Sequence, residues 1–313
     1  MKWTSRVLAV LGLVIVGWVL LTELPAVVHG QWAYAALLVL TALGCVWALV
    51  LHRRRRPTLH GWRRVGSIAL CLGAVGWLAA IAWLRPFSAV EPALAAMESG
   101  AEVVVTESSG RVVLEPADGP ASPTAVFFQP GAKVEARAYA AVLRPLAEAG
   151  HRVVIVKQPL GIAFLSLGAF DAVRAEYPDT QAWVLGGHSL GGTVASMQAD
   201  DNGGDAPGAA RGLLLYASYP ASDLSGSLQA QVTSVFGTED GLATPEDIAA
   251  SRADLPTGSR FVPIEGAVHA FFGDYGPQPG DGEPTISHDE ARTQISNASV
   301  EFVSAVAAAQ VSG

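Results

Sequence analysis

The stretch "AWVLGGHSLGG", residues 182–192, decides how the rest of the chain is interpreted. An apolar run typical of a buried strand ends in the pattern G-x-S-x-G, formed by Gly187, Ser189 and Gly191, and the helix-forming segment "LGGTVASMQAD" follows. A serine on such a sharp strand-to-helix turn projects its hydroxyl clear of the sheet, and the flanking glycines permit the crowded backbone. The N–H groups of the helix start can stabilise developing negative charge. Ser189 is therefore the candidate catalytic nucleophile.

A serine hydroxyl needs a base, and in sites of this kind the partners follow in the order serine, acid, histidine. Of the seven histidines, only His269 and His288 lie late enough in the chain. The sequence "SHDE" pairs Ser287 with Glu290 in a capping box, which predicts a structural place for His288 in the first turn of the last helix. His269 instead follows the last strand in a glycine-rich loop. We predict that His269 is the base.

The acid is sought in "VFGTEDGLATPED", which ends a strand and offers four carboxylates. Thr244 is the expected N-cap of a short helix, so Glu246 and Asp247 belong to its first turn, where carboxylates have a structural role. Asp240 lies just past the strand and precedes a glycine. It is the predicted acid that orients the histidine, and Glu239 is the alternative.

An oxyanion hole requires two backbone donors, one from the residue after the nucleophile and one from the loop after the third strand. Leu190 supplies the first. The loop "FFQPGAKV" occupies the second place, and Gly131 allows a close approach of the backbone. We assign the second donor to Ala132, with Lys133 as the alternative; a simple turn at this place would be compatible with that role.

From residue 101 onward, apolar runs of strand length alternate with segments of helical pattern. The predicted strands are "EVVVTES", "RVVLEPA", "TAVFFQP", "HRVVIVKQP", "QAWVLGG", "GLLLYASYP", "QVTSVFG" and "RFVPIEG". The first two form a hairpin across Ser-Ser-Gly, and the last helix spans residues 288–309. Continuous apolar strands separated by helices predict an α/β fold, with a mostly parallel sheet covered on both faces.

The first quarter of the chain has a different composition. Three apolar runs without any charged residue cover residues 7–21, 32–51 and 65–84, and each is close to the roughly 17–25 residues that a membrane helix needs. The mean hydropathy of +0.35 is high for a wholly soluble protein. Buried helices of a soluble core usually carry a polar stripe, which these lack. We predict a membrane anchor at residues 1–85 with three transmembrane helices, a linker at 86–100, and a hydrolase domain at 101–313.

Basic residues predict how the spans are oriented. Lys2 and Arg6 precede the first span, whereas residues 22–31 contain no lysine or arginine. The link between the second and third spans is rich in arginine: Arg53, Arg54, Arg55, Arg56, Arg63 and Arg64. By the positive-inside rule this link is cytoplasmic, and everything after the third span lies outside. The chain is thus expected in the cell membrane, multi-pass, with its catalytic domain extracytoplasmic.

Charge and cysteine usage exclude several classes of partner. Acidic residues outnumber basic ones after residue 86, and the arginine link is explained by topology, so no nucleic-acid partner is expected. Both cysteines, Cys45 and Cys71, lie in predicted spans, which leaves the outer domain without a thiol-based metal site. No metal and no organic cofactor is indicated.

Together these motifs resemble the α/β-hydrolase superfamily. "GHSLGG", "GTEDGLATPED" and "HAFFGDYGPQPGDG" are similar to small bacterial hydrolases of alpha/beta-hydrolase family 5, near the dienelactone-hydrolase-like branch. The resemblance covers roughly residues 101–309 and implies Ser189 as nucleophile, His269 as base and Asp240 as acid. The chain has serine where dienelactone hydrolases use cysteine, and it lacks the HGGG motif of many lipases. These two departures put dienelactone chemistry in doubt.

The predicted activity is cleavage of ester-type acyl substrates, small or lipid-like, through a serine ester. An acyltransferase with the same triad and a catalytically idle receptor or scaffold are the alternatives, because a fold alone does not prove activity. Only "SYPASDLSGSLQA" separates two strands where related enzymes carry a cap, so we expect an open site without a helical lid. An open site favours short acyl groups, with Phe271 and Phe272 either lining a shallow pocket or packing the histidine loop. Alternatively, the bilayer closes the site and favours long-chain substrates.

Overall fold

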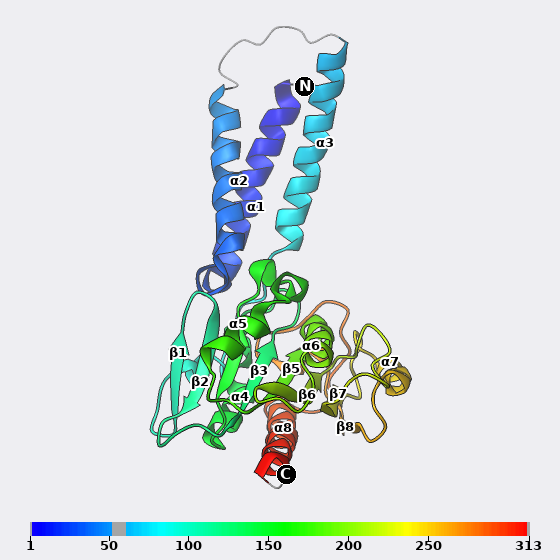
Figure 1. Ribbon diagram of the computed structural model, residues 1–313. Coiled ribbons are helices and arrows are strands. Elements are labelled where there is room, and N and C mark those ends of the chain that lie inside the picture. Colours follow the sequence, from blue (N-terminus) through cyan, green and yellow to red (C-terminus); the bar gives the residue numbers. More distant parts are fainter. Residues whose placement is uncertain (1, 52–60, 312–313) are drawn as a thin grey trace. The chain divides into compact units, whose positions relative to one another are not determined.

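The computed structural model describes residues 2–51 and 61–311 and divides the chain into two compact units, Met1–Pro86 and Phe87–Gly313 (Figure 1). The first unit contains three long helices. The second contains a sheet with its covering helices and carries every residue of the predicted site.

The helices of the first unit are α1 (Lys2–His29), α2 (Trp32–Leu51) and α3 (Trp62–Trp83). They contain three stretches that are long and apolar enough to cross a membrane, Trp3–His29, Trp32–Val50 and Val65–Trp83. The prediction of three such segments is confirmed. The first is longer than predicted, because the helix continues past a kink at Glu23, where φ is −132°. Pro25 explains the kink, since its ring clashes with the preceding turn and it has no N–H to donate.

Hydrogen bonds join α3 to α2 inside the first unit. The hydroxyl of Tyr34 donates to the carbonyl of Ile81 at 2.8 Å, and Nε1 of Trp77 donates to Oγ1 of Thr41 at 2.9 Å. Two polar side chains of α2 and one of α3 thus take part in hydrogen bonds within the unit. Four arginines of the predicted cytoplasmic link lie outside the described residues: Arg53, Arg54, Arg55 and Arg56.

The second unit is built on one eight-stranded sheet. Its strands are β1 (Val103–Glu107), β2 (Arg111–Pro116), β3 (Thr124–Gln129), β4 (Val153–Val156), β5 (Ala182–His188), β6 (Ala209–Tyr216), β7 (Gln231–Gly237) and β8 (Arg260–Ile264). They lie in the order β1-β2-β4-β3-β5-β6-β7-β8. Strand β2 runs antiparallel to β1 and β4, and every other pair is parallel. The predicted mostly parallel sheet with an antiparallel entry hairpin is confirmed.

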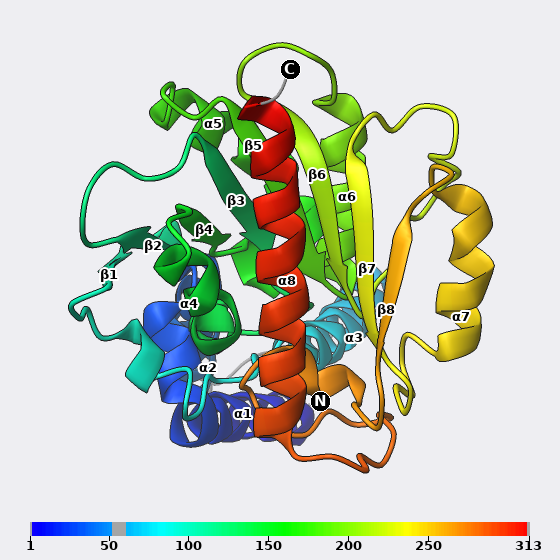
Figure 2. The same cartoon turned by 90° about the horizontal axis from the view of Figure 1, so that it is seen from below.

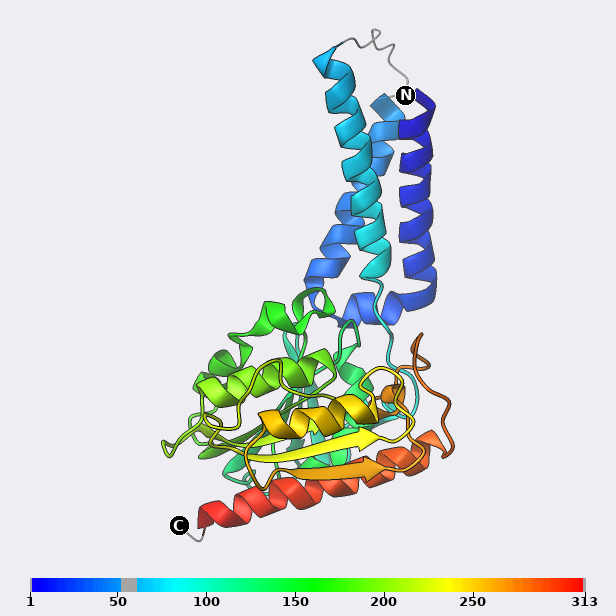
Figure 3. The same ribbon diagram turned by 90° about the vertical axis from the view of Figure 1, so that its right-hand side faces the viewer.

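Two helices cover each face of the sheet's centre. These are α4 (Ala140–Glu148) and α8 (His288–Val311) on one face, and α5 (Ala169–Glu176) and α6 (Leu190–Asp201) on the other, with α7 (Pro245–Ala250) near β7. Figure 2 shows α8 crossing the strands in front of the sheet with α6 behind it. Figure 3 shows the sheet from the side, between the helices of its two faces. Since the central strands are parallel, their carboxyl ends share one edge, where the loops that follow them gather.

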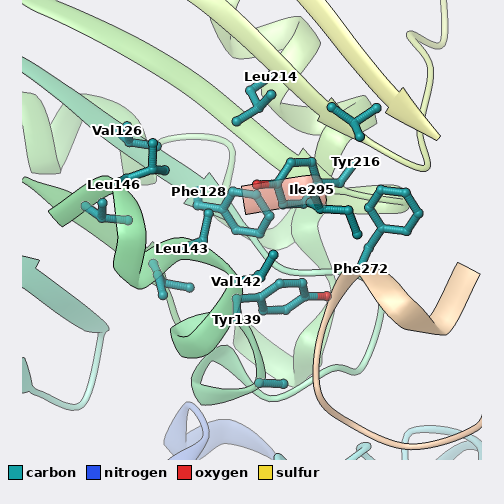
Figure 4. Packing of buried hydrophobic residues seen from close by; sticks show 14 of the residues in the cluster. Val126, Phe128, Tyr139, Val142, Leu143, Leu146, Leu214, Tyr216, Phe272 and Ile295 are labelled. Atoms are coloured by element: carbon teal, nitrogen blue, oxygen red, sulfur yellow. The ribbon is translucent and has the colours of Figure 1, made fainter. Parts of the chain in front are cut away.

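An aromatic cluster fills the core beneath that edge. The ring of Phe128 on β3 lies 5.1 Å from the ring of Tyr139 and 5.3 Å from that of Tyr216, and Tyr216 lies 5.7 Å from Phe272 (Figure 4). Phe272 is fully buried and belongs to the loop of the predicted catalytic histidine. Burial of large aromatic side chains dominates core stability. The cluster therefore fixes this loop to the sheet.

Residues 87–100, predicted as a linker or short helix, contain the short 3-10 helix η1 (Ala95–Met97) and pack onto the hydrolase domain. Ala93 is fully buried. The N–H of Ala89 donates to the carboxylate of Glu135, and the guanidinium of Arg144 donates to the carbonyls of Ala96 and Glu98. The compact second unit thus begins at Phe87.

Stability of the second unit is expected to fall as the pH decreases from 7 to 5. His151 is buried at the start of β4 and its Nδ1–H donates to the carbonyl of Thr124 at 3.0 Å. Burial lowers the pKa of the His151 imidazole, so the unfolded chain takes up a proton below about pH 6.5 that the folded chain does not. A proton that only the unfolded chain binds lowers the free energy of unfolding by at most about 1.4 kcal/mol for each unit by which the pH falls.

The variant His151→Asn keeps a donor for Thr124 but cannot titrate, so it should show a shallower loss of stability than the natural chain. Pulse proteolysis of the full chain in urea and detergent, repeated across this pH range, measures the difference. Equal slopes in the two proteins would show that His151 is not responsible.

Candidate active site

Ser189 lies on the predicted strand-to-helix turn, directly between β5 and α6. Its φ of 52° and ψ of −125° fall in a region that side chains rarely adopt, which stores strain at this position. A Cβ on Gly187 would meet the backbone of Gly191, and a Cβ on Gly191 would meet the carbonyl oxygens of Gln129 and Pro130. Only glycine fits at both positions, and this is what allows the turn to form.

The structure brings Asp240 and His269 into contact. Nδ1 of His269 lies 2.8 Å from Oδ2 of Asp240, and both side chains are buried. The other oxygen, Oδ1, accepts the N–H groups of Leu242 and Ala243 at 2.8 Å each. Because a carboxylate oxygen only accepts, Nδ1 carries the proton and Nε2 is free to act as a base. The side chain of Glu239, the alternative acid, is exposed.

Ser189 and His269 lie at the same edge of the sheet, at the end of β5 and after β8. No hydrogen bond joins their side chains, both of which are among the described residues. Catalytic hydrogen bonds are often long in free enzymes and shorten when substrate binds. The structure therefore shows the Asp240–His269 pair and the turn at Ser189 at one edge of the sheet, without a hydrogen bond between Ser189 and His269.

Two free N–H groups lie in the predicted oxyanion positions. Within the described part of the chain, neither the N–H of Ala132 nor that of Leu190 donates a hydrogen bond. The N–H of Lys133, the alternative donor, is occupied by the carbonyl of Gly161 at 2.7 Å. The geometry thus favours Ala132 over Lys133 as the second donor.

A buried pair that sequence reasoning missed supports this loop. The N–H of Gly131 donates to the hydroxyl of Tyr139 at 2.8 Å, and that hydroxyl lies 2.9 Å from Nδ1 of His188, the residue before the nucleophile. The Tyr139 hydroxyl thus links the oxyanion loop to the ring of His188. Burial lowers the pKa of His188 well below its usual range, and the neighbouring His269 lowers it further. His188 is therefore a neutral support, with its ring 4.5 Å from that of His269.

Asp281 is a second support that sequence reasoning missed. Its carboxylate accepts the N–H groups of His269 at 3.0 Å and Ala270 at 2.8 Å, and also that of Gly241 at 3.3 Å. One carboxylate thus joins the loop of the acid to the loop of the base. The only sequence signal was its place after Pro-Gly in "PQPGDG", which is typical of a turn.

His288 has the structural place that the capping box predicts. It is the first residue of α8, and Oγ of Ser287 accepts the N–H of Glu290 at 3.2 Å. Its ring stacks on Phe271, with 4.5 Å between the ring centroids, and its Nε2 lies 3.4 Å from the buried carboxylate of Asp274. With Phe272 in the core as well, both phenylalanines pack the histidine loop. The idea that they line an acyl pocket is therefore not supported.

The site is open on the side where related enzymes carry a cap. Residues 217–230 connect β6 to β7 without a helix, as predicted. Among the described residues there is also no group of three or more histidine, cysteine or acidic side chains placed to hold a metal ion. What the site offers to a substrate is one hydroxyl, one imidazole with its carboxylate, and two free backbone N–H groups.

Comparison with known proteins identifies the family. The model of the alpha/beta hydrolase family matches residues 125–293, which is more than half of the chain. None of the curated proteins compared with the chain matches it significantly.

Similar solved structures include a serine hydrolase without a lid from Xanthomonas campestris (15% identity, TM-score 0.45), which covers 64% of this chain and 94% of its own. A monoacylglycerol lipase from Paleococcus ferrophilus has 14% identity and a TM-score of 0.48, with 65% of this chain and 99% of the other covered. An esterase from Thermogutta terrifontis has 18% identity and a TM-score of 0.44, with 65% and 91% covered. With its matched residues, its sheet order and its strand-to-helix turn, the chain belongs to the alpha/beta hydrolase family.

Proposed function

We propose that this chain is a serine hydrolase that cleaves ester substrates with Ser189 as nucleophile, His269 as base and Asp240 as the acid that orients the base. The observation that carries the proposal is the buried hydrogen bond of 2.8 Å between His269 and Asp240, at the same sheet edge as the strained turn at Ser189. Membership of the alpha/beta hydrolase family supports it. A buried acid–imidazole pair is the arrangement that activates a weak hydroxyl nucleophile.

The reaction follows from these atoms. Nε2 of His269 takes the hydroxyl proton while Oγ of Ser189 attacks the ester carbonyl carbon. The carbonyl oxygen becomes an oxyanion, which accepts hydrogen bonds from the N–H groups of Ala132 and Leu190. The tetrahedral intermediate collapses, His269 returns its proton to the departing alkoxide, and the alcohol leaves. The acyl group is now an ester of Ser189.

Water completes the cycle by the same route. Nε2 of His269 removes a proton from water, whose oxygen attacks the acyl carbon, and the second oxyanion uses the same two N–H groups. Collapse breaks the bond to Oγ, and the proton returns to Ser189 as the carboxylic acid leaves. Asp240 stays ionised throughout, holding the tautomer of His269 and stabilising the imidazolium.

We also propose that α1, α2 and α3 cross a cell membrane and that Phe87–Gly313 lies outside the cytoplasm. Support comes from the length and apolar composition of the three helices, and from the basic residues that flank the predicted spans. An acidic, cysteine-free catalytic domain is compatible with an extracytoplasmic setting.

One labelling experiment tests both proposals. A membrane-impermeant fluorophosphonate, which modifies only activated serines, is added to sealed membrane vesicles of known orientation that contain the full chain. Right-side-out vesicles should be labelled directly, and inside-out vesicles only after detergent is added. Ser189→Ala should remove the label, and Ser227→Ala, which changes an exposed serine of the open connection, should keep it.

The outcomes separate the alternatives. Absence of label even in detergent would contradict the serine hydrolase and favour an idle scaffold. Direct labelling of inside-out vesicles alone would place the catalytic domain in the cytoplasm. Unlabelled full chain that, given an ester substrate, transfers the acyl group to an added alcohol in preference to water would identify an acyltransferase instead.

A further inference from the structure

The exposed apolar side chains of the second unit are concentrated at one edge. Among its described residues, seven large apolar or aromatic side chains are exposed. Six of them, all except Val104 on β1, lie on loops at the edge that carries Ser189, Asp240 and His269. These six form what we call the apolar rim: Val90, Phe164, Leu165, Leu167, Tyr219 and Leu242.

The centre of the rim is the loop that follows β4. Residues 158–170 carry no charged side chain, and within them Phe164, Leu165 and Leu167 are 43%, 55% and 45% exposed. Soluble surfaces rarely expose several large apolar side chains together, and such patches usually mark an interaction site. A loop that is both exposed and free of charge is suited to an apolar surface.

This loop is fixed beside the oxyanion positions. The carbonyl of Gly161 accepts the N–H of Lys133, Oγ of Ser166 donates to Oε1 of Gln129, and Nε2 of Gln198 donates to the carbonyl of Leu167. Three separate hydrogen bonds thus hold the apolar side chains outward in a defined position. The patch is a built surface, not a loose loop that happens to be exposed.

The other members lie on loops that hold the catalytic groups. The N–H of Leu242 donates to Asp240 itself, the carbonyl of Tyr219 accepts from Thr193 on α6, and the N–H of Val90 donates to the carbonyl of Asp274 in the histidine loop. Exposed apolar side chains are thus carried by three further segments that are hydrogen-bonded to the elements of the site.

A short covalent link joins the third apolar helix to a residue that is hydrogen-bonded to the oxyanion loop. Helix α3 ends at Trp83, and Phe87, four residues on, exchanges hydrogen bonds with the oxyanion loop: its N–H donates to the carbonyl of Lys133 at 2.8 Å, and its carbonyl accepts the N–H of Glu135 at 3.0 Å. Four residues of extended chain span at most about 14 Å. The covalent link thus limits the distance between Phe87, which is hydrogen-bonded to the oxyanion loop, and the end of α3 to about 14 Å.

We infer that the apolar rim docks on the lipid bilayer that holds the three helices, so that acyl esters resident in the membrane reach Ser189 directly from lipid. The substrate part of this inference rests on the proposed function, whereas the docking part does not. A bilayer is the apolar phase that the covalent link keeps within reach, and an uncharged loop can enter its interface without placing a charge in hydrocarbon. The bilayer would also close a site that has no lid.

Docking is tested with an environment-sensitive fluorophore on the full chain in liposomes. In a Cys45→Ala, Cys71→Ala background, Leu165→Cys is labelled with a nitrobenzoxadiazole dye, and Thr257→Cys, on an exposed loop before β8 at the opposite edge, is the matched control. The Leu165 label should emit at shorter wavelength and be quenched by lipids that carry a nitroxide on the acyl chain. The Thr257 label should be unaffected. A Leu165 label that emits as in water and escapes quenching would overturn the inference.

Substrate delivery is tested with the double variant Phe164→Ser, Leu165→Ser, and with Val104→Ser on β1, whose exposure equals that of Phe164, as the control. The double variant should hydrolyse a water-soluble short ester as the natural chain does, while hydrolysis of an ester embedded in vesicles falls about tenfold or more, because apolar area that enters lipid is lost. Equal losses on both substrates would contradict delivery from lipid. If the natural chain hydrolyses no ester, the proposed function is refuted, and the fluorescence result still tests docking.

Discussion

Ser189→Ala is expected to lower kcat/KM for a water-soluble ester by a factor on the order of 10⁴ to 10⁶, with little change in stability. The substitution removes only the hydroxyl, so the strained turn and both free N–H groups remain in place. His269→Ala should cost about as much, because nucleophile and base act as one unit. The double variant should be no slower than either single variant, which stopped-assay kinetics with a chromogenic ester can measure.

Asp240→Asn should lose a factor of about 10⁴, for a reason that the geometry makes specific. Oδ1 accepts two backbone N–H groups, so the asparagine oxygen stays there and its NH₂ faces Nδ1 of His269. The imidazole must then accept at Nδ1 and carry its proton on Nε2, where it cannot take one from Ser189.

The matched control is Glu239→Gln, which changes the exposed neighbour and should leave kcat/KM unaltered. A Glu239→Gln variant that loses activity while Asp240→Asn keeps it would reverse the assignment of the acid. Full activity in Ser189→Ala would end the serine-hydrolase proposal.

Gly191→Ala is expected to destabilise the second unit by several kcal/mol, which corresponds to a fall in Tm of roughly 10 °C for a unit of this size. The added Cβ would meet the carbonyl oxygens of Gln129 and Pro130, which belong to the end of β3 and cannot move without shifting the oxyanion loop. Overpacking against backbone cannot be relieved by rotating a side chain.

Gly168→Ala is the control, because a Cβ there meets nothing within 4 Å and the φ of −81° suits any residue. It should change Tm by little. Thermal unfolding of the full chain in detergent, followed by protease resistance of the fragment 87–313, compares the two. Equal Tm values for Gly191→Ala and Gly168→Ala would mean that helix α6 can move away from strand β3 without loss of stability.

Patterns that repeat along the chain were sufficient to predict the layered fold. Continuous apolar strands such as β5, and the alternation with helices, follow from local residue preferences and from burial on both faces. Ser189 was predictable because G-x-S-x-G imposes a backbone shape that only a few residues can adopt. Asp240 and His269 followed from chain order and from the absence of a better structural role for each.

The supports of the site could not be predicted in the same way. Tyr139 and His188 are 49 residues apart, and their hydrogen bond depends on how the residue before α4 lies against the last residue of β5 in the folded unit. Asp281 accepts N–H groups from two loops whose approach is set by the whole sheet. Residues 87–100 have a composition compatible with a linker, and their place in the domain depends on contacts that are distant in sequence, such as the hydrogen bonds to Glu135 and Arg144. The apolar rim could not be predicted from the sequence either, because the exposure of a side chain depends on how the whole molecule packs.

The hydroxyl of Tyr139 has a consequence for how this chain can evolve. One oxygen serves two buried neighbours, the N–H of Gly131 and Nδ1 of His188, so a change to phenylalanine leaves both without a partner at once. A change of His188 to an apolar residue removes one of the two hydrogen-bond partners of the buried Tyr139 hydroxyl. Each single substitution is therefore expected to give a less stable protein than the two substitutions made together. In descendants of this sequence, the two positions are expected to covary, as one inherited unit spread over two distant parts of the gene.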